Sequence, residues 1–151
     1  MIITFLGHRS ILNCDALFEK IKSILLENTN VHEKISFYCG GYGDFDHLCA
    51  RVCRDIQKNN PNCEIVFVTP YILSSKPPQS TDVTFYDSIV YPPLEKVPPK
   101  IAILRRNEWM IDQADLIIAY ITYSYGRAYT GMKYAKRNRK RVINLAEELL
   151  M

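Results

Sequence analysis

Residues 39–46 read Cys-Gly-Gly-Tyr-Gly-Asp-Phe-Asp and join a strand-like run to a helix-like run. The preceding residues 35–39 are branched and aromatic, as in a buried strand, and apolar residues recur at helical spacing after Asp44. Three glycines let the backbone approach a ligand closely, and the first turn of the new helix has free N–H groups that favour an anion. The stretch therefore predicts a phosphate-bearing ligand, with a simple turn capped by Asp44 as the alternative.

The composition of the 151-residue chain is typical of one soluble globular domain, because 48% of the residues are apolar and 23% are charged. A net charge of +3 is too small to imply nucleic-acid binding by itself. The five cysteines lack paired C-x-x-C motifs, as expected for a protein without a disulfide framework. The first residues have neither the basic start nor the long apolar run of a secretory signal, so a reducing cytoplasm is expected. We predict no membrane segment, no cofactor and no metal. Cys49 and Cys53 lie four residues apart on a predicted helix, but we expect them to be buried in the core.

Strand-like and helix-like runs alternate along the chain, which implies right-handed crossovers and a parallel sheet. We predict an α/β fold, namely a single Rossmann-like three-layer domain over residues 1–151 with a central parallel sheet of about five strands. Strands are expected at 2–6, 35–39, 64–69, 116–120 and 141–145. Helices are expected at 13–27, 44–58, 101–112, 132–137 and 146–151.

A Pro- and aromatic-rich insertion at about 70–100 interrupts the alternation. It contains seven prolines and is too long for a passive connection, so we expect an excursion over the binding edge of the sheet. Tyr71 follows the third strand directly and is a candidate to stack on a base. The alternative is that its ring belongs to a small core of the insertion itself.

Two further loops are expected at the carboxyl edge of the sheet, where ligands of such folds bind. The first, Gly7-His8-Arg9-Ser10, follows the first strand, and Arg9 is a candidate phosphate clamp because its guanidinium donates parallel hydrogen bonds. His8 is a candidate acid–base group or neutral hydrogen-bond donor, and a purely structural histidine is the alternative. The second loop runs from Tyr123 to Gly131 and also precedes a helix.

Taken together, these motifs resemble the SLOG superfamily, the Rossmann-like group that includes LOG-type nucleoside 5'-monophosphate phosphoribohydrolases and the DNA-processing protein DprA. The Gly-His-Arg opening is similar to its small YpsA-like or YspA-like branch of bacteria and phages. The resemblance covers nearly the whole chain and implies a nucleotide or nucleotide-derived ligand, with its phosphate on the glycine loops. The motifs that carry it are Gly7-His8-Arg9, Gly40-Gly41-x-Gly43-x-x-Asp46, Arg106-Asn107-x-x-Met110, Ala114-Asp115-x-x-Ile118-Ala119, and the Gly126 to Gly131 turn with Lys133-Tyr134-Ala135.

The resemblance leaves three functions open. In LOG enzymes an Arg matching Arg106 acts with a Glu of a Pro-Gly-Gly-x-Gly-Thr-x-x-Glu loop, but here residues 123–131 lack both Pro-Gly-Gly and Glu. The favoured interpretation is binding, that is, sensing or sequestration, of a nucleotide-derived ligand. The first alternative is a phosphoribohydrolase-like N-glycosidase with Asp46 and Arg106 as catalytic residues, although Asp46 is favoured as a helix cap or a ribose ligand. The second alternative is DprA-like nucleic-acid binding through the basic run 133–141, which we rate as less favoured because such runs are usually solvated. The predicted ligand-binding residues are Gly7, His8, Arg9, Gly40, Gly41, Tyr42, Gly43, Asp44, Tyr71, Asn107, Gly126, Arg127, Thr130 and Gly131.

The helix expected at 101–112 is apolar nearly all round, which predicts that one of its faces meets a partner. A homodimer, or an oligomer built from dimers, with Trp109 at the interface is the expected solution. The alternative is that the insertion at 70–100 folds back and buries Trp109 within one chain.

Overall fold

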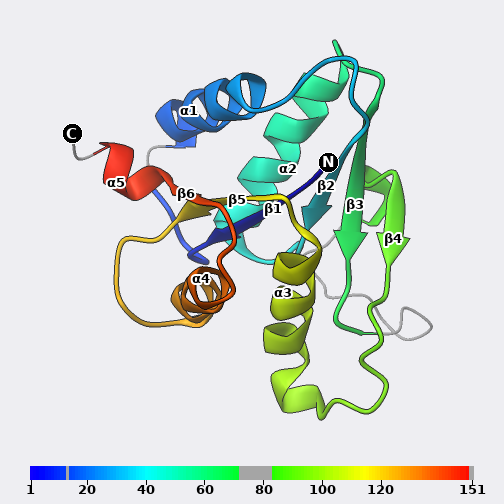
Figure 1. Ribbon diagram of the computed structural model, residues 1–151, viewed down its shortest axis with the longest axis vertical. Coiled ribbons are helices and arrows are strands. Elements are labelled where there is room, and N and C mark those ends of the chain that lie inside the picture. The colour runs from blue at the N-terminus through cyan, green and yellow to red at the C-terminus, as the bar shows by residue number, and fades with distance from the viewer. Residues whose placement is uncertain (13, 72–82, 150–151) are drawn as a thin grey trace.

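The computed structural model describes residues 1–12, 14–71 and 83–149, and its elements alternate between strands and helices (Figure 1). The strands are β1 Ile2–Gly7, β2 Ile35–Cys39, β3 Cys63–Val68, β4 Ser88–Val90, β5 Leu116–Tyr120 and β6 Val142–Asn144. The α-helices are α1 Cys14–Glu27, α2 Gly43–Gln57, α3 Ala102–Gln113, α4 Arg127–Arg137 and α5 Leu145–Leu149, and short 3-10 turns occupy Val83–Phe85 and Pro99–Ile101.

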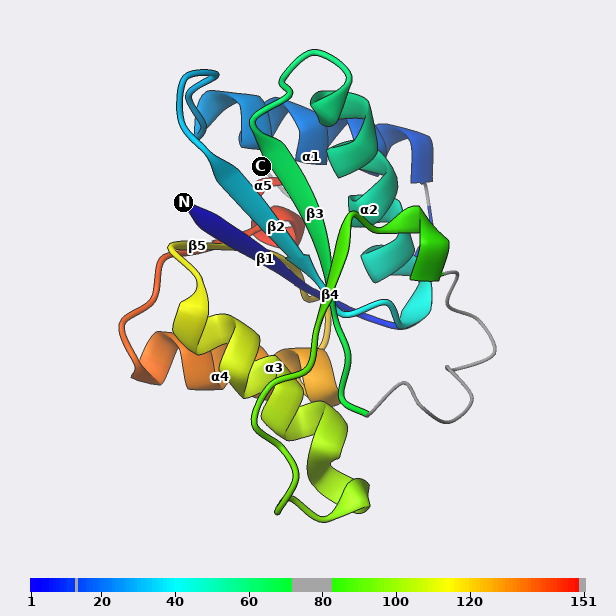
Figure 2. The same cartoon turned by 90° about the vertical axis from the view of Figure 1, so that its right-hand side faces the viewer.

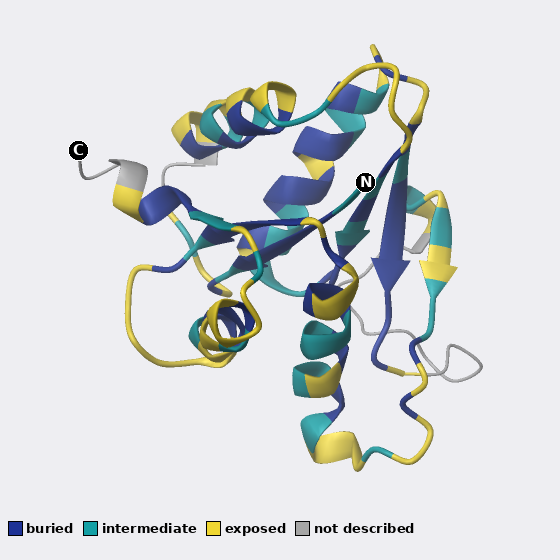
Figure 3. Cartoon of the chain, in the orientation of Figure 1, coloured by how far each residue is buried: buried dark blue, intermediate teal, exposed yellow. Residues whose placement is uncertain are grey.

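All strand pairs are parallel, and the sheet order is β4-β3-β2-β1-β5-β6. Helices α1 and α2 cover one face of the sheet and α3 and α4 cover the other (Figures 1 and 2). The predicted three-layer α/β fold is therefore confirmed. The central strand β5 is almost wholly buried, which explains its unbroken apolar sequence Leu-Ile-Ile-Ala. Figure 3 shows the contrast between this buried centre and the exposed residues 122–127 that follow it.

The helices cover the sheet because their apolar residues recur at helical spacing. On α1 the buried stripe contains Leu17, Ile21 and Leu25, and on α2 it contains Phe45 and Leu48. Each large side chain buried in this way contributes about 1.5–3 kcal/mol relative to exposure.

The sheet has six strands rather than five, because β4 lies inside the segment predicted as an insertion. It has only three residues and pairs with β3 at the edge of the sheet, with Val66 opposite Ser88. Tyr91, Pro92 and Pro93 follow it, so its sequence lacks the long branched run of an inner strand. Residues 72–82 of the insertion lie outside the described residues.

Helix α4 begins at Arg127, five residues before the expected start at Met132, so that Thr130 and Gly131 are helical. Glycine is a poor helix former, which made residue 131 look like part of a loop. Its missing side chain has a packing reason, because a Cβ there would lie 3.3 Å from the Leu6 side chain of β1. Gly131 therefore lets α4 approach the sheet closely.

The cysteines Cys39, Cys49, Cys53 and Cys63 are buried, as expected for small apolar residues. Within the described ranges, no group of three or more His, Cys, Asp or Glu side chains is placed to hold a metal ion. No helix in these ranges is both long and apolar enough to cross a membrane.

The sheet order creates a crevice between β1 and β5. From β1 the chain proceeds to β2 on one side, and from β5 it proceeds to β6 on the other, so the two connections diverge. In open α/β sheets ligands bind outside the carboxyl ends of the strands at such a point. Gly7 pairs with Tyr120 at this end, which places the loop at residues 7–10 beside residues 121–127.

Candidate functional site

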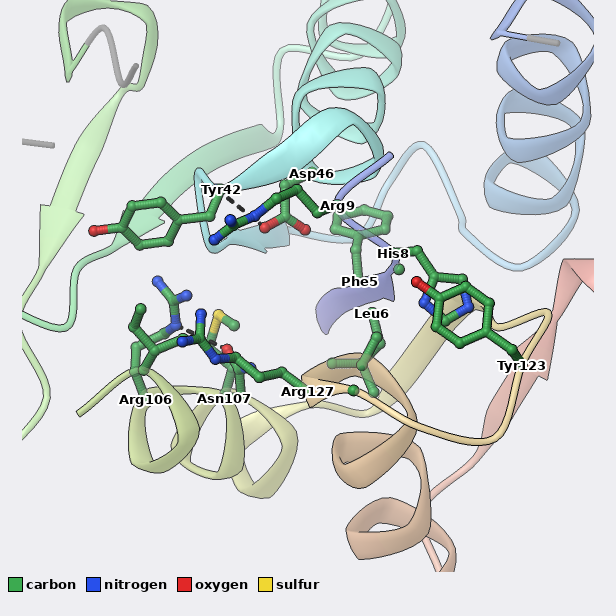
Figure 4. Close-up of a pocket in the computed structure, with 15 residues that line it drawn as sticks. Phe5, Leu6, His8, Arg9, Tyr42, Asp46, Arg106, Asn107, Tyr123 and Arg127 are labelled. Atoms are coloured by element: carbon green, nitrogen blue, oxygen red, sulfur yellow. Dashed lines mark hydrogen bonds between the residues drawn. The ribbon is translucent and has the colours of Figure 1, made fainter. Parts of the chain in front are cut away.

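A cleft of about 320 Å³ lies at this divergence point (Figure 4). Its walls come from the carboxyl end of β1 and the following loop, the start of α2, the middle of α3 and the start of α4. The lining residues are Phe5, Leu6, Gly7, His8, Arg9, Tyr42, Asp46, Ile103, Arg106, Asn107, Met110, Tyr123, Gly126, Arg127 and Ala128.

The cleft brings together many of the predicted site residues from four separate segments. Those that line it are Gly7, His8, Arg9, Tyr42, Asp46, Arg106, Asn107, Gly126 and Arg127. Those that lie outside its lining are Gly40, Gly41, Gly43, Asp44, Tyr71, Thr130 and Gly131. Sequence reasoning missed Tyr123 and the apolar lining residues. The aromatic character of the loop at 123–131 is the signal that could have identified Tyr123.

Arg106 links α3 to the ends of two strands. Its side chain is only 2% exposed, and Nη1 donates hydrogen bonds to the carbonyl oxygens of Gly40 and Val68, both at 2.8 Å. Its Nε donates to Oδ1 of Asn107 at 2.9 Å, and the guanidinium lies 5.2 Å from the centre of the Tyr42 ring. Burial lowers the pKa of Arg106, but guanidinium stays charged in proteins, so a fixed positive charge borders the cleft.

Asp46 is the carboxylate of the cleft. Its Oδ2 accepts a hydrogen bond from the backbone N–H of Tyr42 at 3.1 Å. Burial raises the pKa of Asp46 from 3.8 to about 6, against the opposing effects of Arg106, this N–H group and His47. Gly40 explains how the two charged groups come together, because a Cβ there would lie 3.0 Å from Oδ2 of Asp46 and 3.2 Å from the Arg106 guanidinium.

We predict that Asp46→Asn removes part of the pH dependence of stability. Because its folded-state pKa is raised from 3.8 to about 6, the folded protein holds this proton more tightly than the unfolded chain. The stabilisation is therefore fully present below the unfolded pKa and is lost as the pH rises through about 6. Between about pH 5 and 7.5 the loss from this group is about 1.4 kcal/mol. Urea unfolding of both proteins at the two pH values measures it, and an equal loss in both would contradict the assignment.

The glycines of residues 40–43 pack against the protein itself. Gly41 has a φ of 75°, and a Cβ there would lie 2.7 Å from the ring of Phe67. Gly43 has a φ of 87°, and its Cβ would lie 2.9 Å from Cα of Arg9. The packing of a buried side chain and of the Arg9 backbone therefore accounts for glycine at these two positions. Close approach to a ligand, the sequence-based reason for glycine here, stays a prediction.

The N-terminus of α2 already has acceptors from the chain. The N–H of Asp44 donates to the carbonyl oxygen of Arg9 at 2.7 Å, and the N–H of Tyr42 donates to Asp46. The Asp44 carboxylate in turn accepts from the N–H of Ile11 at 3.3 Å. These bonds join α2 to the loop after β1, and they use N–H groups that the sequence had suggested for a phosphate.

The N-terminus of α4 differs in its backbone donors. Its N-cap is Gly126, with a φ of 93°, and in neither α4 nor α2 does the side chain of the N-cap residue cap the first turn. Among the described residues, no acceptor from another segment takes the N–H groups of Arg127 and Ala128, whereas the Arg9 carbonyl oxygen takes that of Asp44. The N–H and hydroxyl of Thr130 both donate to the Gly126 carbonyl oxygen at 3.0 Å, so Thr130 closes the first turn. Gly126, Arg127 and Ala128 line the cleft, and Arg127 lies close enough to Arg106 to lower its pKa further. This helix end and Arg127 favour an anion in the cleft, and Arg9 lines the opposite wall beside Asp46 (Figure 4).

His8 fixes the loop that leads to α4. It is 5% exposed, its Nε2 accepts the N–H of Thr122 at 2.9 Å, and its ring stacks on Tyr123 at 3.6 Å. Because Nε2 is an acceptor, the proton of the neutral ring lies on Nδ1. Burial lowers the pKa of His8 and so keeps it neutral. Of the roles considered from sequence, a neutral positioning group agrees best with this geometry.

No protein-family model and no curated protein sequence matches the chain. The fold is similar to DNA processing protein A from Helicobacter pylori, with a TM-score of 0.67, 15% identity, and coverage of 94% of this chain and 63% of that one. It is also similar to the structural-genomics target TM1055, with a TM-score of 0.57 and 13% identity, and the match covers 98% of this chain and 79% of that one. For DNA processing protein A (DprA) from Streptococcus pneumoniae the TM-score is 0.55 at 10% identity, covering 98% and 60%.

The chain thus spans less than two thirds of the length of either DprA chain. At such low identity the likeness shows the fold alone. The shared fold agrees with the Rossmann-like fold that the sequence motifs predict, and it does not test the YpsA-like branch.

Proposed function

We propose that this protein binds a phosphorylated nucleoside, or a ligand derived from one, in the cleft of Figure 4. The observation that carries the proposal is the charge of the lining, in which Arg9, Arg106 and Arg127 face a single carboxylate, Asp46. In a partly dehydrated site this excess of positive charge attracts an anion more strongly than it would in bulk water. A volume of about 320 Å³ is at the lower end of small-ligand sites, which suits a mononucleotide.

We place the phosphate between Arg9, Arg127 and the first turn of α4. Both guanidinium groups can donate bidentate hydrogen bonds, and Arg127 and Ala128 of the first turn of α4 line the same cleft. The phosphate is therefore proposed at the helix that follows β5, whereas the sequence pattern favoured the helix that follows β2.

Asp46 is proposed to accept a hydrogen bond from a ribose hydroxyl. With a pKa of about 6 it is mainly ionised at neutral pH, and an ionised carboxylate only accepts hydrogen bonds. The ring of Tyr42 borders the cleft and is proposed to offer a flat apolar surface to a base, whereas the ring of Tyr123 already contacts the rings of His8 and Tyr125.

Binding without cleavage is favoured because Arg106 is engaged with the protein. Three of its five N–H donors go to Gly40, Val68 and Asn107, so it holds the architecture of the cleft. The alternative remains an N-glycosidase in which Asp46 stabilises an oxocarbenium-like transition state. In that case Asp46 and Arg106 would be the catalytic residues.

One experiment separates these functions. Calorimetric titration with AMP, GMP, CMP and UMP measures binding, and chromatography of the same samples detects free base. We expect at least one nucleotide to bind with no base released. Base release that is lost in Asp46→Asn would favour the glycosidase, and no binding of any of the four would contradict a mononucleotide ligand.

Nucleic-acid binding is a second candidate, and one observation on this chain favours it. Helix α4 carries no acidic residue, and Lys133, Lys136 and Arg137 are exposed along it. The structure from Helicobacter pylori is described as showing a single-stranded DNA binding mode for DNA processing protein A. If this chain binds a strand, oligo-dT affinity should fall with salt and fall again in Lys136→Ala/Arg137→Ala.

The homodimer stays a prediction. Trp109 is half-buried, and its ring lies parallel to that of Tyr38 at 5.8 Å, within a cluster that includes Val66, Val68 and Val90. These contacts within one chain account for part of its apolar surface.

A further inference from the structure

A second cavity, of about 480 Å³, lies next to the cationic cleft at the same end of the sheet. It is formed at the carboxyl ends of β5 and β6, between α4 and the start of α5. Tyr123 lines both cavities, so the loop at 121–126 separates them. Nothing in the proposed nucleotide site uses the second cavity.

The walls of this cavity have the opposite charge character to the cleft. They include the rings of Tyr120, Tyr123 and Tyr129 and the thioether of Met132. Glu147 is the charged residue of the lining, and neither lysine nor arginine lines it. Aromatic rings carry a negative face, so rings and a carboxylate together favour a cation with an apolar body.

One contact at the edge of the cavity shows this preference within the chain. The ammonium group of Lys133 lies 5.3 Å from the centre of the Tyr129 ring, a cation–π distance. Lys133 is exposed and is not part of the lining. The lining itself therefore carries one formal charge, the carboxylate of Glu147.

The floor of the cavity is preformed by Asn144. Its Oδ1 accepts the N–H groups of Ile121 at 3.0 Å and Ala146 at 3.2 Å, and its Nδ2 donates to the Ile121 carbonyl oxygen at 3.2 Å. This buried amide fixes the end of β5 relative to the start of α5. A fixed floor lowers the ordering cost of binding, which a pocket of this size needs.

We propose that this cavity is a second ligand site, separate from the cleft, for an aromatic amine. The aromatic body packs against the tyrosine rings and Met132, and the ammonium group lies near Glu147. The chemistry differs from that of the cleft, so the two sites select ligands of opposite charge.

Tryptamine and indole-3-acetate test the proposal because they share the indole ring and differ in charge. In amide NMR titrations we expect tryptamine to shift the resonances of Ile121, Ser124 and Ala146. A surface-accessible ion pair contributes about 0.2–1 kcal/mol, so tryptamine should bind about 1.4-fold to fivefold more tightly than indole-3-acetate. Glu147→Gln should remove most of that difference. Equal affinities in the wild-type protein would overturn the proposal.

A matched variant locates the site. Ser124 is exposed and lines this cavity but not the cleft, so Ser124→Trp should fill the mouth and abolish the tryptamine shifts. AMP titration of the same variant reports on the cleft independently. Tryptamine shifts that persist in Ser124→Trp, or that map to Arg9 and Asp46, would overturn the proposal. If the wild-type protein binds tryptamine as predicted and does not bind AMP, that result would count only against the proposed nucleotide function.

Discussion

Replacing both Arg9 and Arg127 by Ala is expected to weaken AMP binding by about 10²- to 10⁴-fold. Each guanidinium is proposed to hydrogen-bond the phosphate, and a hydrogen bond to a charged group contributes about 1.5–3 kcal/mol. The reason for a large combined effect is that both side chains line the same cleft beside the uncapped end of α4. Calorimetry on the purified variant measures the loss.

The design separates phosphate recognition from general charge. Adenosine lacks the phosphate, so its affinity should change little in Arg9→Ala/Arg127→Ala. Lys136→Ala/Arg137→Ala removes two positive charges from the last turn of the same helix and should leave AMP binding within about twofold, because exposed charges at that distance are screened. Equal losses for AMP and adenosine would move the phosphate away from these arginines.

Gly7→Ala is expected to destabilise the fold by about 3 kcal/mol or more. A Cβ at residue 7 would lie 2.2 Å from two ring carbons of Phe45 and 2.5 Å from its Cβ, distances that no side chain tolerates. Phe45 is fully buried and stacks on Tyr120 at 6.1 Å, so it has no free space to enter. Either α2 or β1 must shift, and the cost lies at the upper end of overpacking effects or beyond.

Urea unfolding measures the change in the free energy of unfolding. Two further experiments test whether the contact with Phe45 is its cause. Gly131→Ala is the matched control, because its Cβ would meet Leu6 at 3.3 Å and alanine favours the helix, so we expect a change within about 1 kcal/mol. A double-mutant cycle with Phe45→Ala should show favourable coupling, because that change removes both ring carbons at 2.2 Å and leaves only the Cβ at 2.5 Å. A Gly7→Ala protein as stable as the wild type would contradict the packing shown here.

The sequence alone was sufficient for the class of fold. Strand and helix periodicities are local properties, so runs such as Leu-Ile-Ile-Ala at 116–119 and the stripe of α2 identify their elements directly. The alternation of these elements then implies a parallel sheet with its edge loops on one side, which brought Arg9 and the loop that contains Arg127 to attention. The resemblance to the SLOG superfamily added Asp46 and Arg106 as candidates. The elements that were wrong are those with weak local signals, namely the three-residue strand β4 and the first turn of α4.

The location of the anion-favouring helix end depended on the tertiary structure. In sequence, residues 40–46 and 126–131 are alike, because each places glycine before a helix at the carboxyl edge of the sheet. In the folded chain the N–H of Asp44 in α2 donates to the Arg9 carbonyl oxygen, and the N–H of the N-cap residue Tyr42 donates to the Asp46 carboxylate. At α4, among the described residues, no acceptor from another segment takes the N–H groups of Arg127 and Ala128. A backbone N–H that already has a partner contributes little to an anion. Local sequence determines that a helix begins with free donors, and only the packing of distant segments decides whether the protein's own acceptors take them.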